Sequence, residues 1–150
     1  YYCDESKCSA NEMIYDMCNK VEADIIVWAH CTNPLVSPET YDRAVVKFLE
    51  NEKKGYDSLL SVNTIQEHLW SSELAPMNYD PKAKRHILAK QLPKLYKQDG
   101  AIFIQRKKDF LKNSYFFGDN PFLFILEERE SKDINTEVDL KIANLFKELK

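Results

Sequence analysis

Apolar residues recur along the chain at two spacings, one typical of helices and one typical of buried strands. Residues 9–21 carry apolar side chains at every third or fourth position, which predicts an amphipathic helix. Ser9 followed by Glu12 three residues later is the capping-box pattern that marks the start of such a helix. Residues 25–28 form a short, continuous apolar run, and this run predicts a strand that is covered on both faces.

The same two patterns continue through most of the remaining chain. Ser37 and Pro38 predict the start of a second helix, and Lys-Lys-Gly at 53–55 predicts its end. Further strands are predicted at 57–62, 100–104 and 122–126, with a short helix at 106–112 and a terminal helix at 138–149. Because helices separate the strands, we expect an α/β fold with right-handed crossovers and a mostly parallel sheet. Ligands of such sheets bind beyond the carboxyl ends of the strands, where the loop 30–36 is expected to lie.

Residues 66–98 lack a clean hydrophobic period and differ in composition from the rest of the chain. Three prolines interrupt this segment, and basic residues cluster in it: Lys82, Lys84, Arg85, Lys90, Lys94 and Lys97. We therefore expect an excursion from the main sheet that contains one short helix. A solvated loop is the simpler alternative.

Length and composition restrict the class of protein. The chain has 150 residues, of which 44% are hydrophobic and 30% charged, as in an ordinary globular domain. No apolar run approaches the about 20 residues that cross a bilayer, so we expect no membrane association. The net charge of −3 gives no bulk attraction to nucleic acid, and the three glycines form no glycine-rich phosphate loop. The four cysteines lack the paired spacing of a zinc site, and we expect reduced thiols in a cytoplasmic protein.

Four segments carry more specific sequences. Residues 25–35 form a strand followed by His-Cys-Thr-Asn-Pro-Leu, and residues 75–79 read Ala-Pro-Met-Asn-Tyr. Residues 91–104 contain Leu-Pro and then Asp-Gly-Ala-Ile-Phe-Ile, and residues 133–140 read Asp-Ile-Asn-Thr-Glu-Val-Asp-Leu. In order and in spacing, these segments resemble the acylneuraminate (CMP-sialic acid) cytidylyltransferases.

The resemblance implies a fold, a reaction and an assembly. The fold is a three-layer α/β sandwich of the nucleotide-diphosphosugar-transferase kind, with a mainly parallel or mixed sheet. The reaction joins CTP to a nine-carbon keto sugar acid, and the sugar hydroxyl displaces pyrophosphate from the α-phosphate. Such phosphoryl transfer depends on positioning and on cations that clamp the phosphates, which suits Mg²⁺. The family also implies a homodimer in which the segment equivalent to 66–98 reaches the second subunit.

The resemblance also implies a metal site at the start of the last motif. Asp133 matches the first aspartate of the family's metal motif, and a loop aspartate without a ligand role is the alternative. Asn135 stands where the family has its second aspartate, and an amide oxygen would bind a cation without contributing charge. The alternative is that Asn135 or Thr136 caps the final helix. Asp139 fits a first-turn acid that the helix dipole favours better than it fits a ligand.

Other positions match the family's sugar-binding and nucleotide-binding residues. His30 stands where the family has a glutamine that helps to hold the sugar, and a histidine satisfied at a strand end is the alternative. Thr32 and Asn33 resemble the loop that lines the site. Ser9 matches a serine near the nucleotide, a role compatible with its predicted capping role.

One departure concerns the sugar carboxylate. Ala89 stands where the family commonly has an arginine that binds this group, so Lys90 or Arg85 would have to supply the charge. Lys97 matches a second basic position. Aromatic residues match positions beside the sugar, with core packing as the alternative: Phe103, Phe116 and Phe117.

The family's N-terminal strands and their phosphate-binding loop have no counterpart in this sequence. We therefore expect a single partial cytidylyltransferase domain over 1–150, a fragment that is inactive alone. The changes at His30, Ala89 and Asn135 favour a sialic-acid relative, such as legionaminic or pseudaminic acid, as the substrate. The alternative is a non-catalytic dimerisation or binding module that keeps the fold without the chemistry.

Overall fold

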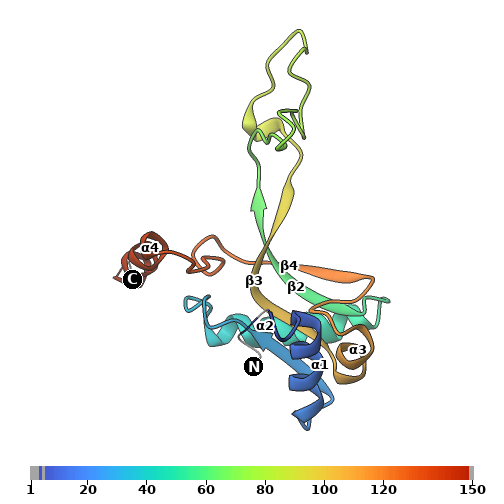
Figure 1. The fold of residues 1–150 in the computed structure, drawn as a ribbon. Coiled ribbons are helices and arrows are strands. Elements are labelled where there is room, and N and C mark those ends of the chain that lie inside the picture. The colour runs from blue at the N-terminus through green and yellow to red at the C-terminus, as the bar shows by residue number, and fades with distance from the viewer. Residues whose placement is uncertain (1–3, 5, 149–150) are drawn as a thin grey trace.

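The computed structural model describes residue 4 and residues 6–148 (Figure 1). These residues form four strands, four α-helices and one 3₁₀ turn. In chain order these are α1 (Ala10–Lys20), β1 (Ile25–Ala29), α2 (Pro38–Glu52), β2 (Ser58–Ile65), η1 (Ala89–Gln91), β3 (Leu95–Arg106), α3 (Lys107–Asn113), β4 (Pro121–Ile125) and α4 (Glu137–Glu148).

The four described strands form one mixed sheet in the order β1-β3-β2-β4. β3 is antiparallel to both β1 and β2, and β4 is parallel to β2. Strands β1, β2 and β4 therefore run in one direction and β3 runs in the other. The expected α/β fold with a mixed sheet is confirmed, but the expectation of mostly parallel pairing is wrong. The reason is the segment between β2 and β3, which turns back like a long hairpin and returns the chain antiparallel.

Local sequence determines where the helices begin and end. The Ser9 hydroxyl accepts a hydrogen bond from the Glu12 N–H at 3.2 Å, and the Glu12 carboxylate accepts one from the Ser9 N–H at 2.8 Å. The predicted capping box of α1 is thus confirmed. Ser37 caps α2, which begins with Pro38. Gly55 follows the end of α2 with φ of +95°, a conformation that favours glycine.

Helices cover both faces of the sheet, because alternate strand residues point to opposite sides. Leu59, Ile102 and Ile104 pack with Phe48 of α2 in one cluster. Their neighbours Leu60 and Phe103 pack on the opposite face. On that opposite face α1 and α3 add a further cluster, made of Ile14, Cys18, Ile26 and Phe110. These layers match the expected three-layer sandwich.

Residues 66–94 form an arm that projects away from the sheet (Figure 1). β2 and β3 run together into its base, where Val62 pairs with Gln98 and Ile65 with Leu95. Within the arm, the Gln66 amide donates to the Leu92 carbonyl at 2.9 Å. The expected excursion at 66–98 is present, but its end was misplaced, because β3 begins at Leu95 and not at residue 100. Its short helix is the 3₁₀ turn Ala89–Gln91.

Candidate functional site

A bulge in β3 marks the place where the arm leaves the sheet. On the β2 side, Leu60 pairs with Phe103 whereas Val62 pairs with Gln98, so residues 99–102 lie opposite Ser61 alone in that strand. A bulge of this kind bends the strand and increases its twist, and such bulges are common beside active sites. It therefore redirects the two strands into the arm.

Side chains replace the missing ladder hydrogen bonds at this bulge. The Ser61 hydroxyl donates to Asp99 Oδ1 and accepts from the Ile102 N–H at 2.8 Å. The Ala101 N–H also donates to Asp99 Oδ1, at 3.0 Å. Gly100 has φ of +80°, so the bulge favours glycine at this position. Asp99 is only 6% exposed, and the bulge thus holds a carboxylate inside the protein.

The loop after β1 contacts the same bulge. His30 Nδ1 lies 2.7 Å from the Gly100 carbonyl oxygen. Because a carbonyl oxygen only accepts, Nδ1 carries the proton and donates it. The Asn33 amide donates to the Asp99 carbonyl at 3.5 Å, and the Thr32 carbonyl accepts from the Ile134 N–H at 2.9 Å. The expected loop thus joins the bulge to the segment that contains Asp133.

A cavity of about 280 Å³ lies between the bulge and the segment before α4. Three of the predicted site residues line it: Lys97, Asp133 and Asn135. Asn63, Asp99 and Asp139 line it as well, although no sequence signal assigns a role in the site to Asn63 or Asp99. The structure therefore brings the predicted metal motif together with residues of β2 and β3.

Three oxygen atoms of this cavity's lining are buried and have no hydrogen-bond partner within the described residues. They are Asn63 Oδ1, Asp99 Oδ2 and Asp133 Oδ1. A buried polar atom without a partner is costly, so such atoms often mark a bound water or ion. Burial raises the pKa of Asp99, although the Ser61 hydroxyl and the Ala101 N–H oppose this effect. The cavity is thus suited to a group that donates hydrogen bonds or carries positive charge.

The polar residues at the start of α4 have different roles. The Asn135 amide donates to Asp133 Oδ2 at 2.7 Å, so Asn135 orients the Asp133 carboxylate. Thr136 Oγ1 accepts from the Asp139 N–H at 3.2 Å, and the Asp139 carboxylate accepts from the Thr136 N–H at 2.9 Å. Hydrogen bonds from Thr136 and Asn135 lower the pKa of Asp139 despite its partial desolvation. Thr136 is therefore the helix cap, and Asp139 is the first-turn acid that the sequence predicts.

The predicted aromatic residues gather on the side of the sheet opposite α2. The ring of Phe116 lies 4.8 Å from that of Phe103 and 5.4 Å from that of His30, measured between centroids. Phe117 packs against the same cluster. Phe103 is 1% exposed, so it is a core residue. Core packing was the alternative to a position beside the sugar. His30 therefore lies between the aromatic cluster and the bulge.

Two predicted residues neither line the cavity nor bond to the bulge or the loop after β1. Ser9 caps α1 and is exposed. Lys90 lies in the arm, in the 3₁₀ turn, as an exposed residue. The predicted roles of Ser9 at the nucleotide and of Lys90 at the sugar thus have no support from their positions in this chain.

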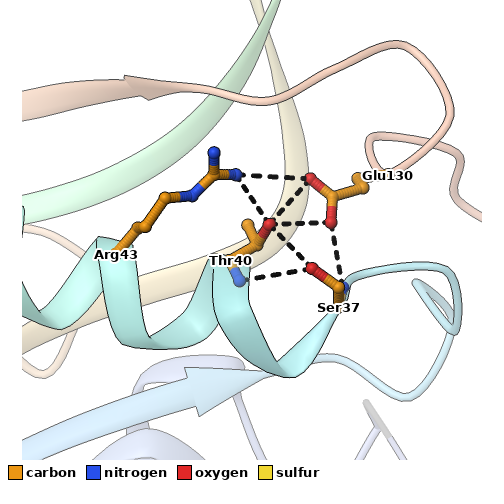
Figure 2. Close-up of polar contacts among 4 residues, drawn as sticks. All are labelled: Ser37, Thr40, Arg43 and Glu130. Atoms are coloured by element: carbon orange, nitrogen blue, oxygen red, sulfur yellow. Dashed lines mark hydrogen bonds and ion pairs between the residues drawn. The ribbon is translucent and has the colours of Figure 1, made fainter.

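Glu130 anchors the segment before α4 to α2 (Figure 2). The sequence analysis did not predict a role for this residue. The Glu130 carboxylate accepts from the Ser37 N–H at 3.0 Å and from the Thr40 hydroxyl at 2.7 Å. Arg43 donates to the Thr40 hydroxyl at 2.8 Å and lies 3.9 Å from Glu130 Oε2. Burial favours the neutral acid, but these hydrogen bonds and Arg43 outweigh burial and lower the pKa of Glu130. Glu130 thus holds the segment that presents Asp133.

The described residues contain neither a cluster of metal-ligating side chains nor a membrane-spanning helix. No group of three or more His, Cys, Asp or Glu side chains there is placed to hold a metal ion. Mg²⁺ commonly uses one or two protein carboxylates and takes its other oxygens from phosphate and water, so this finding is compatible with a magnesium site. None of the helices in that part of the chain is long and apolar enough to cross a membrane.

The fold and the motifs agree with comparisons to known proteins. A cytidylyltransferase family model matches residues 3–149, and the chain therefore belongs to the cytidylyltransferase family. This confirms the resemblance found in the four motifs. A solved structure of CMP:2-keto-3-deoxy-manno-octonic acid synthetase, complexed with CTP, matches with a TM-score of 0.59. The match covers 95% of this chain and 69% of that one at 13% identity, and so it concerns the fold alone.

Two curated relatives come from Campylobacter. Post-translational flagellin modification protein B of Campylobacter coli is 25% identical over 130 residues, which cover 85% of this chain and 54% of the relative. CMP-N,N'-diacetyllegionaminic acid synthase of Campylobacter jejuni subsp. jejuni serotype O:2 is 36% identical over 58 residues, which cover 39% of this chain and 25% of the relative. The chain thus spans about half the length of the first relative.

Proposed function

We propose that this chain forms the sugar-binding and metal-binding part of an enzyme that activates a sialic-acid-like nine-carbon sugar acid. The anomeric hydroxyl of the sugar would attack the α-phosphorus of CTP, forming a phosphoester bond. The bond between the α- and β-phosphates would break, and pyrophosphate would leave. The observation that carries the proposal is the cavity that joins Asp133 and Lys97 within a chain of the cytidylyltransferase family.

Asp133 is the residue best placed to hold Mg²⁺. Its Oδ1 is buried without a partner in the described part of the chain, while its Oδ2 is held by Asn135. Asn135, proposed from the motif as a ligand, fits better as the residue that orients Asp133. Bound Mg²⁺ would neutralise charge on the phosphates of CTP. Lys97 lines the same cavity and would add a second positive charge for phosphate or for the sugar carboxylate.

The sugar would lie toward the loop after β1. His30 already donates from Nδ1 to the Gly100 carbonyl, so Nε2 is the ring nitrogen left to contact a sugar hydroxyl. Thr32 and Asn33 continue from His30 toward the cavity. Phe116 and Phe117 supply apolar surface beside His30 for the acyl group of the sugar. The name of the second relative, a legionaminic acid synthase, favours a legionaminic-type acid over other nine-carbon acids.

The arm would contact a second copy of this chain. Leu74 is 82% exposed there, and three further large apolar side chains are exposed: Trp70, Met77 and Leu88. Such exposed apolar side chains on a projecting arm suit a protein interface. We expect a homodimer, and sedimentation of the variant Leu74→Glu should show dissociation into monomers. The same sedimentation behaviour as the unmodified chain would contradict this assembly.

The free thiols of Cys8 and Cys18 fit the expected cytoplasmic location.

Binding of the sugar acid tests the proposed function on the chain itself. Saturation-transfer NMR would compare N-acetylneuraminic, legionaminic and pseudaminic acids, with the eight-carbon acid of the solved relative as a control. We expect one of the nine-carbon acids to bind, and Lys97→Met to weaken its binding. Equal signals from all four acids, or from none, would contradict the proposal.

A further inference from the structure

We propose that Asp99 is a direct ligand of a divalent cation in the cavity, together with Asp133 and Asn63. This inference deepens the proposed function, because it rests on the cation assigned there to Asp133. It adds a carboxylate from the sheet, outside the motif that contains Asp133.

The bulge leaves one oxygen of Asp99 without a role in the fold. Oδ1 accepts from the Ser61 hydroxyl and from the Ala101 N–H. Oδ2 is buried and has no hydrogen-bond partner among the residues that the structure describes. The side chain lines the cavity, and the residue is 94% buried because only 6% of its surface is exposed. A structural carboxylate at a bulge would need Oδ1 alone.

Two other unpartnered oxygens line the same cavity from other parts of the chain. Asn63 contributes Oδ1 from β2, and Asp133 contributes Oδ1 from the segment before α4. All three atoms are hard oxygen donors, which are the ligands that Mg²⁺, Mn²⁺ and Ca²⁺ prefer. Three separate segments thus supply unsatisfied oxygens to one space, and one cation bound there would satisfy all of them.

The charges around the cavity favour a divalent cation. Four carboxylates line it, on Asp99, Glu128, Asp133 and Asp139, and two ammonium groups line it, on Lys97 and Lys132. With all of these groups ionised, two negative charges remain, which one divalent cation would balance. Asn135 carries no charge, whereas Asp99 adds a second carboxylate to that of Asp133.

Mn²⁺ binding tests this assignment without any requirement for catalysis. Mn²⁺ alone is titrated into the unmodified chain and followed by electron paramagnetic resonance, with Mg²⁺ as a competitor. We expect one site, and we expect Asp99→Asn and Asp133→Asn each to weaken it at least tenfold. Loss of a residue that merely supports a metal ligand commonly weakens metal binding about 10- to 100-fold, and loss of a ligand should do no less. Asp42→Asn is the matched control, because Asp42 is exposed on α2 and should leave binding unchanged.

Circular dichroism must first show that each variant is folded. If Asp99→Asn does not fold, Asn63→Ala takes its place, because Asn63 is only partly buried and its replacement should leave the fold intact. We expect this variant to bind Mn²⁺ severalfold more weakly than the unmodified chain. Unchanged Mn²⁺ binding by Asp99→Asn, or no binding by the unmodified chain, would overturn the inference. If the unmodified chain binds Mn²⁺, the variants weaken this binding as expected, and no sugar acid binds, the proposed function is contradicted but this inference stands.

Discussion

The substitution Glu130→Gln tests whether a buried carboxylate anchors the segment that presents Asp133. The change keeps the size and shape of the side chain but removes its negative charge. Two hydrogen bonds that are now charge-assisted, from the Ser37 N–H and the Thr40 hydroxyl, would become neutral. We expect the free energy of unfolding to fall.

The size of this effect follows from the contacts. A hydrogen bond to a charged group contributes about 1.5–3 kcal/mol and a neutral one about 1 kcal/mol, so two bonds lose about 2 kcal/mol. Loss of a negative charge at the N-terminus of α2 removes about 0.5–1 kcal/mol more. An amide is less costly to bury than a carboxylate, which offsets part of the loss. The expected net change is about 2 kcal/mol, since Glu130 is only 8% exposed and solvent screens it little.

Urea unfolding at pH 7, followed by circular dichroism, measures this change. Glu127→Gln is the matched control, because Glu127 is exposed three residues away and lines the same hollow as Glu130. The control should change the free energy of unfolding by less than about 0.5 kcal/mol. An equal effect of the two substitutions would refute the anchoring role.

The same contacts predict a pH dependence. The pKa of Glu130 is lowered in the folded chain, so its stabilising contribution is present above the unfolded pKa of about 4.3. That contribution is lost as the pH falls through the lower, folded pKa. The difference in stability between the unmodified chain and Glu130→Gln should therefore shrink as the pH is lowered below about 4. A difference that stays constant down to pH 3 would show that the charge is not responsible.

Three further substitutions test other parts of the account. Ser9→Ala removes the capping box of α1 and should lower the free energy of unfolding by about 1 kcal/mol. In NMR titrations the affinity of this variant for the sugar acid should be unchanged. Weaker binding would favour a nucleotide or sugar role for Ser9. Gly100→Ala places a side chain at φ of +80° and should destabilise the chain by about 1–2 kcal/mol in urea unfolding. An unchanged free energy of unfolding would contradict the preference of the bulge for glycine. His30→Phe keeps an aromatic ring but removes both nitrogens, and it should weaken sugar-acid binding about fivefold to tenfold; unchanged NMR affinity would exclude His30 from the sugar site.

Local patterns were sufficient to predict most of the helices. The capping residues Ser9 and Ser37 act on backbone groups within three residues, so the sequence alone contains the whole interaction. The strands were found for a similar reason, because their apolar runs are continuous. The direction of β3 was not predictable in this way, since it depends on the path of the arm. Its bulge also depends on pairing with Ser61, which is 38 residues away from Asp99.

The candidate site was predictable only where a motif marked it. Asp133, Asn135 and Lys97 were named from the resemblance to the family, and they line one cavity. Asp99 stood inside a quoted motif, but only the fold shows that it is buried with an unpartnered oxygen. Glu130 carries no local signal, because its partners lie 90 or more residues away along the chain, at Ser37 and Thr40.

Release of pyrophosphate from CTP tests the central claim most directly. The protein produced from its whole reading frame would be incubated with CTP, Mg²⁺ and each nine-carbon sugar acid, with Asp133→Asn as the matched variant. The account predicts pyrophosphate release that requires both CTP and one of the sugar acids, and a large loss of this activity in Asp133→Asn. Release that does not depend on the sugar acid, or equal activity in Asp133→Asn, would contradict the account.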